Sequence, residues 1–182
     1  NDFVDLKESF FENIYNYCNE KKVKKDFHKR NPHQEQAIDN IINGFKTNDR
    51  GQYISACGSG KTLTALWLIE ELNVKNILFL VPNLALIKQT LDEWIDQRKT
   101  YFRYLCICSD KTADRDVKKL NEDEFDIDID ELYVPPTTNP DKIISFLEDE
   151  NDERKIIFST YQSTDKLQEA LEKVNFNFDI II

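Results

Sequence analysis

A run of small residues that ends in Gly-Lys-Thr is the part of this sequence best suited to chemistry. It reads Ser-Ala-Cys-Gly-Ser-Gly-Lys-Thr and extends from Ser55 to Thr62. Glycines let a backbone wrap closely around an anion, and the inward-facing N–H groups then form a nest for phosphate. Lys61 can reach the β- and γ-phosphates of a nucleoside triphosphate, and the Thr62 hydroxyl can ligate Mg²⁺. The run therefore predicts a phosphate-binding P-loop whose catalytic residues are Lys61 and Thr62.

The segments on both sides of this loop fit the prediction. Tyr53-Ile54 predicts a short strand before it, and residues 60–72 predict a helix after it. A glycine loop between a strand and a helix is the context in which this motif binds phosphate. The consensus begins with glycine, and Ser55 takes that place, which is a mild departure because serine is also small. The predicted cofactor-binding residues of the loop are Ser55, Ala56, Cys57, Gly58, Ser59, Gly60, Lys61 and Thr62.

A second candidate lies upstream, in the segment from Arg30 to Ile38. Its Gln34 has an amide that can pair with the N6 amino group and N7 of adenine together. A capped surface helix that begins at Pro32 accounts for the same residues equally well.

Two further candidates follow apolar runs that predict strands. Pro82-Asn83 comes after residues 76–81, and Thr160 comes after residues 155–159. The unpaired N–H groups at the start of a helix can hold a nucleic-acid phosphate. Ordinary helix capping explains Asn83 better on chemistry alone, and it explains Thr160 equally well.

Strand and helix patterns alternate along the chain and predict an α/β fold with a mostly parallel central sheet between helices. Strands are expected at 53–54, 76–81, 102–107, 155–159 and 178–182, and helices at 32–45, 60–72, 83–97, 140–149 and 162–173. An accessory helix is expected over 3–20, within an N-terminal extension of residues 1–28. The remaining domain, 29–182, carries an acidic insertion at about 109–138. Ligands of such sheets bind beyond the carboxyl ends of the strands.

Composition limits the class of protein. The 182 residues are 40% hydrophobic, which suits one domain with a core, and no apolar run is long enough to cross a membrane. The net charge of −10 argues against a uniformly basic nucleic-acid surface. The four cysteines lack metal-ligand spacing and are expected to be free thiols in the cytoplasm.

Taken in order, these segments resemble the first RecA-like lobe of the superfamily 2 (DEAD/DEAH-like) helicases. The correspondence assigns Gln34 to the Q motif, residues 55–62 to motif I, residues 81–94 to motif Ia and residues 156–163 to the "TYQS" motif. A finer resemblance is to the helicases associated with type ISP restriction–modification enzymes. It is carried by residues 84–94, 108–110, 137–140 and 159–163.

The resemblance implies a RecA-like three-layer sandwich that uses ATP and Mg²⁺. Gln34 would read adenine with Arg30 nearby, and Pro82, Asn83 and Thr160 would lie along the backbone of a nucleic acid, DNA rather than RNA. It also implies an ATP-dependent helicase or translocase with a second RecA-like lobe outside this chain, and a parent protein with nuclease or methyltransferase domains.

One motif of the family is not matched. Its acidic pair is expected just beyond residue 182, after the strand at 178–182, and Asp179 precedes the apolar stretch and cannot substitute. The chain alone is therefore expected to bind nucleotide and to hydrolyse it negligibly. A small-molecule P-loop kinase and a nucleotide-binding module without turnover stay open as alternatives.

Overall fold

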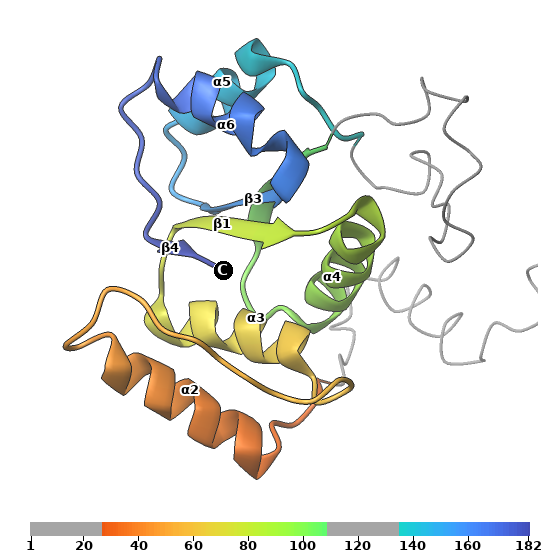
Figure 1. Cartoon of the computed structure of the whole chain (residues 1–182), viewed down its shortest axis with the longest axis vertical. Coiled ribbons are helices and arrows are strands. Elements are labelled where there is room, and N and C mark those ends of the chain that lie inside the picture. The colour runs from red at the N-terminus through yellow and green to blue at the C-terminus, as the bar shows by residue number, and fades with distance from the viewer. Residues whose placement is uncertain (1–26, 109–134) are drawn as a thin grey trace, which may run out of the picture. The chain divides into compact units, whose positions relative to one another are not determined.

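The computed structural model describes residues 27–108 and 135–182 (Figure 1). The chain divides into two compact units, Asn1–Arg30 and Asn31–Ile182, and the description below concerns the second. The helix predicted over 3–20 and the acidic part of the predicted insertion lie outside the described residues. The predicted domain boundary after residue 28 stays a prediction.

Parallel strands form the centre of this unit. Within the described residues the sheet has four of them: β1 (Asn76–Val81), β2 (Phe102–Ile107), β3 (Arg154–Thr160) and β4 (Ile180–Ile181), in the order β2-β3-β1-β4. In the register, Val81 pairs with Thr160, and Ile107 pairs with Ser159. The three longer strands therefore end together, at an edge that we call the carboxyl edge (Val81, Ile107 and Thr160). The predicted α/β class and parallel sheet are confirmed.

Helices cover both faces of the sheet. They are α2 (Pro32–Gly44), α3 (Lys61–Leu72), α4 (Leu84–Gln97), α5 (Pro140–Glu148) and α6 (Thr164–Leu171), the last preceded by the 3₁₀ turn η4 (Tyr161–Ser163). Figure 1 shows α3 and α4 on one side of β1, and α5 and α6 on the other. The alternation along β1 explains this arrangement, because Ile77 and Phe79 pack with the α3–α4 side and Leu78 packs with the α5–α6 side.

Local sequence fixes where three helices begin. Pro32 is the first residue of α2, and Asn31 and Gln34 form a reciprocal capping box there. The side chain of Asn83 accepts a hydrogen bond from Leu86 N at 3.0 Å, and Asn139 caps α5 in the same way. These starts agree with the predicted helices.

Arg154 determines the direction of α3. This buried residue opens β3, and its guanidinium donates to Val74 O at 2.8 Å and to Ile69 O at 3.4 Å. Burial lowers its pKa, and the charge of Glu70 opposes that shift. Because these bonds hold the end of α3 at the start of β3, the first turn of α3 points toward the carboxyl edge.

The predicted strand at Tyr53-Ile54 is wrong. Residues 51–56 have no regular structure, and the Ile54 side chain is 87% exposed. A strand exists only through pairing with a neighbour, and within the described residues none pairs with this segment. The strand predicted at 178–182 is present but shorter, since β4 covers only Ile180–Ile181. Ile182 continues the pairing with β1: its N–H donates to Leu78 O at 2.9 Å, and its carbonyl accepts from Leu80 N at 2.7 Å. None of the described helices combines the length and the apolar character needed to span a bilayer.

Asp179 provides a test of this arrangement. Its Oδ2 accepts hydrogen bonds from the backbone N–H groups of Lys75 (2.9 Å) and Asn76 (2.8 Å), at the edge opposite the P-loop. We expect Asp179→Ala to lower the free energy of unfolding by about 1–3 kcal/mol, because two backbone donors lose a charged acceptor. Urea denaturation measures this loss. Asp152→Ala, which breaks only an exposed pair with Lys75, should change stability little. Equal effects of the two changes would contradict the assignment.

Candidate nucleotide-binding site

The backbone of the loop from Ser55 to Thr62, hereafter the phosphate loop, is shaped to bind an anion. Gly58 and Gly60 have φ angles of 74° and 77°, a left-handed conformation that glycine adopts at low cost. Within the described residues, the backbone N–H groups of Gly60, Lys61 and Thr62 have no acceptor. They lie at the start of α3, where the helix dipole adds a partial positive charge. The arrangement matches the nests in which proteins hold phosphate groups.

Lys61 lies across this loop. Its ammonium donates to Ala56 O at 2.8 Å and to Ser55 O at 3.1 Å. These contacts hold a full positive charge at the first residues of the same loop that carries the unpaired N–H groups at its other end. The Thr62 hydroxyl has no hydrogen bond within the described part of the chain and is therefore available as a ligand.

Ser59 is the point at which the loop is held. Its carbonyl accepts a hydrogen bond from Gln34 Nε2 at 3.1 Å and lies 3.3 Å from His33 Nε2. Its hydroxyl accepts one from Ser55 Oγ at 2.6 Å. The serine that replaces the first glycine of the consensus thus connects the start of the loop to its middle. Sequence reasoning missed this connection and the role of His33; the position of His33 beside Gln34 was the available signal.

Gln34 is committed to the backbone in this structure. Its side chain is 3% exposed, its Oε1 accepts from Asn31 N at 2.8 Å, and its Nε2 bonds Ser59 O. Both ends of the amide are therefore engaged, and the observed role of Gln34 is to attach α2 to the phosphate loop. Its reading of adenine stays a prediction, as does the role of Arg30, which belongs to the other unit.

The residues of the loop fit a polyphosphate. Backbone donors, a helix N-terminus and Lys61 all favour negative charge. The described residues contain no group of three or more His, Cys, Asp or Glu side chains that could hold a metal. The Thr62 hydroxyl could give Mg²⁺ one protein ligand, and phosphate oxygens would supply others, which is the usual way this ion is bound beside nucleotides.

The cysteines differ in their surroundings. Cys57, within the phosphate loop, is exposed, whereas Cys106 in β2 is buried, and both are free thiols. Burial raises the pKa of Cys106 to about 12, with a smaller contribution from Cys108. At neutral pH the Cys106 thiol is therefore protonated and unreactive.

The carboxyl edge brings the remaining candidates together. Pro82 is exposed directly after β1, and Asn83 caps α4 with its side-chain oxygen. Thr160 lies beside them because it pairs with Val81, but its side chain is 3% exposed and its hydroxyl donates to Ser163 Oγ at 3.1 Å. Tyr161 and Gln162 are exposed at this turn, and 59% of the Tyr161 surface is accessible. Contact of Pro82, Asn83 and Thr160 with nucleic acid stays a prediction.

Gly60 allows a test of the loop. A Cβ there would lie 2.5 Å from Gln34 Nε2, and the residue has a φ of 77°. We expect Gly60→Ala to destabilise the fold by about 1–2 kcal/mol from the backbone conformation alone, and to weaken nucleotide binding because Gln34 must move. Thermal unfolding and calorimetric titration with ADP measure the two effects.

Gly44→Ala is the matched control, because an added Cβ there meets nothing within 4 Å and the residue ends α2 without a left-handed φ. It should leave both quantities nearly unchanged. Wild-type ADP affinity in Gly60→Ala would contradict the role given to this glycine.

Comparison with known proteins agrees with this geometry. Two solved structures of type ISP restriction–modification enzymes resemble the chain. One is a nuclease-deletion mutant of LlaGI in complex with a DNA substrate mimic: the TM-score is 0.67 and the identity 32%, over 85% of this chain and 15% of that one. The other is ATP-dependent LlaBIII bound to DNA: the TM-score is 0.71 and the identity 31%, over 88% of this chain and 10% of that one. The chain thus spans a small part of either enzyme. No curated protein matches it.

The family assignment rests on a match along most of the sequence. Residues 27–182 match the model of the family described as type III restriction enzyme, res subunit. The resemblances to superfamily 2 helicases and to type ISP enzymes, predicted from the sequence, are confirmed, and so is the RecA-like fold. The chain belongs to the type III restriction enzyme res-subunit family.

Proposed function

We propose that this chain is the ATP-binding lobe of a nucleic-acid-dependent motor that acts on DNA. The observation that carries the proposal is the phosphate loop itself, which combines unpaired N–H groups at the start of α3 with the ammonium of Lys61. The direction of α3 supports it further, because the loop then lies at the same edge of the sheet as Pro82 and Asn83. A nucleotide and a nucleic-acid strand could thus be held on one rigid scaffold.

The chain's own residues would bind and orient the nucleotide. The loop amides and Lys61 would neutralise the β- and γ-phosphates, and Gln34 would keep the loop in position through Ser59. Thr62 would hold Mg²⁺, which supplies further neutralisation of the phosphate charge when bound. The carboxylates that act on the metal and on water are expected outside this chain, as is a second RecA-like lobe.

DNA is the proposed partner because both related structures contain DNA or a DNA mimic. Contacts from the turns after β1 and β3 would reach the phosphate backbone and would not read the bases, which suits a motor that moves along any sequence. Nuclease and methyltransferase domains in the parent protein, and strand separation or translocation by it, belong to the same proposal.

The two alternatives are distinguishable. A small-molecule kinase would phosphorylate its substrate without any effect of nucleic acid, and a binding module would bind nucleotide without turnover in the full-length protein. Family membership favours the motor over both. ATPase activity of the full-length protein that rises on addition of duplex DNA is the result expected from a motor alone.

Lys61 tests the nucleotide site. Lys61→Ala should weaken ATP and ADP binding by about tenfold to a hundredfold, since a hydrogen bond to a charged group is lost, and should abolish DNA-stimulated ATPase activity. Calorimetry and a coupled ATPase assay measure these effects. Lys75→Ala removes an equal charge at the opposite edge and should bind nucleotide normally. Unchanged affinity in Lys61→Ala would refute the assignment of the loop.

Asn83 tests the nucleic-acid edge. Asn83→Asp keeps an oxygen that can cap α4 but places a negative charge beside the proposed DNA backbone. We expect DNA affinity to fall by about fivefold, because like charges a few Å apart in water repel by about 1 kcal/mol, and the loss should shrink at high salt.

Asn73→Asp is the control for this change. Asn73 ends α3 at the opposite edge with a φ of 52°, a conformation that Asp also tolerates. Fluorescence anisotropy of a labelled duplex measures both variants. A similar loss of affinity in both would show that overall charge, and not the position of Asn83, determines binding.

A further inference from the structure

Trp94 is the side chain that connects α4 to the phosphate loop. It is 0% exposed, and its indole N–H donates to Thr62 O at 2.8 Å. Thr62 lies in the first turn of α3 and carries the hydroxyl proposed to hold Mg²⁺. A buried indole N–H requires a partner, so this bond fixes the distance between α4 and the start of α3.

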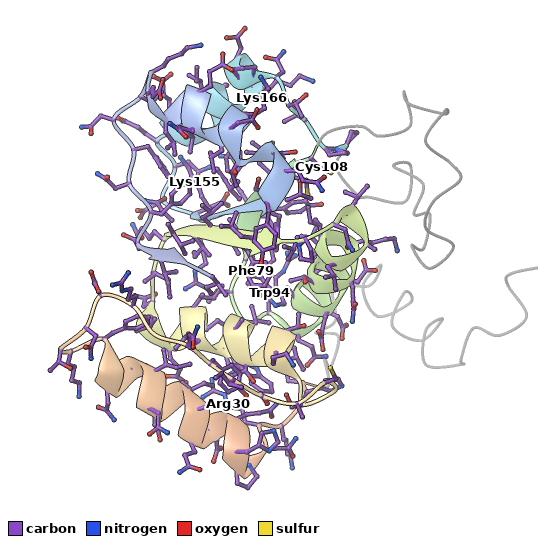
Figure 2. The ribbon with its side chains drawn as sticks, in the orientation of Figure 1. Arg30, Phe79, Trp94, Cys108, Lys155 and Lys166 are labelled. Atoms are coloured by element: carbon purple, nitrogen blue, oxygen red, sulfur yellow. The ribbon has the colours of Figure 1, made fainter. Side chains whose placement is uncertain are left out.

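The Trp94 ring also contacts the strands that lead to the carboxyl edge. Its centroid lies 5.0 Å from that of Phe79 in β1 and 5.6 Å from that of Phe158 in β3, and both pairs meet edge to face. Figure 2 shows Phe79 and Trp94 together on the α3 side of β1. A displacement of β1, β3 or α4 would therefore move the indole.

These contacts join the two proposed sites through one residue. Asn83 is the N-cap of α4, the helix that contains Trp94, and β1 and β3 end at Val81 and Thr160. Close-packed interiors transmit small displacements because they contain few voids that could absorb them. A strand of DNA that shifts the start of α4 would thus shift the Thr62 carbonyl.

We propose that Trp94 is a positioning residue that couples contact with nucleic acid at the carboxyl edge to the phosphate loop. The inference rests on the proposed function. The coupling element is the hydrogen bond from the indole to Thr62, and the ring contacts with Phe79 and Phe158 hold the indole in place. Because Trp94 is fully buried, it would act through Thr62 and not through direct contact with nucleotide or DNA.

Trp94→Phe in the full-length protein removes the indole N–H and keeps one aromatic ring, and it also leaves a void where the second ring was. We expect the stimulation of ATPase activity by duplex DNA to fall by about tenfold, the factor to which the net free energy of one hydrogen bond corresponds. The KM for ATP should stay within about twofold, because binding rests on the loop amides and Lys61. The loss should therefore appear in kcat with DNA bound.

Trp67→Phe makes the same chemical change at a buried position of α3 and is the matched control. It should lower stability to a similar degree and retain full stimulation. A benzothienylalanine at position 94 keeps the volume and both rings but has sulfur in place of the N–H; it should behave like Trp94→Phe and decides the outcome if that variant folds poorly.

Three outcomes separate the hypotheses. Full DNA stimulation in both Trp94 variants would overturn the coupling role and leave the motor assignment intact. Equal loss of stimulation in the Trp67 control would show that core packing alone is responsible, and would also overturn the role. No stimulation in the wild-type protein would overturn the proposed function and this inference together.

Discussion

The parallel pairing of β3 with β1 and β2 is the constraint on which the rest of the structure depends. All seven residues of β3 are buried, so the strand can lie only between neighbours and under helices on both faces. Its first residue, Arg154, holds the end of α3, and its last residue, Thr160, pairs with Val81. These two contacts place the phosphate loop and the turn after β1 at the same edge. Without the pairing, residues as far apart in the sequence as Val81 and Thr160 would have no reason to meet.

Elements with strong local signals could be predicted from the sequence. The continuous apolar run of β1 predicted a strand at the residues observed, because a strand covered on both faces must be apolar throughout. The start of α2 at Pro32 and of α4 after Asn83 followed from proline geometry and from capping chemistry, both of which act over three or four residues. The sequence signal of the phosphate loop is equally local, because the types of eight consecutive residues define it.

Features that depend on a spatial partner could not be predicted. Tyr53 and Ile54 have the composition of a strand, but pairing decides whether a strand forms, and no local pattern encodes the partner. Thr160 was expected to offer its hydroxyl, yet the register of β3 buries it and leaves Tyr161 exposed. The bond from Trp94 to Thr62 likewise depends on how α4 crosses α3, which residue spacing within either helix does not reveal.

The hydroxyl bridge from Ser55 to Ser59 has a thermodynamic consequence. A flexible glycine-rich segment must surrender conformational freedom when it closes around a ligand, and that loss opposes association. Here the hydrogen bond between the two serines and the bond from Gln34 to the Ser59 carbonyl restrict the segment in the absence of a ligand. Part of the conformational entropy that ligand binding would cost is therefore already lost when the chain folds. A serine in place of the consensus glycine can in this way make the loop more rigid in the absence of a ligand.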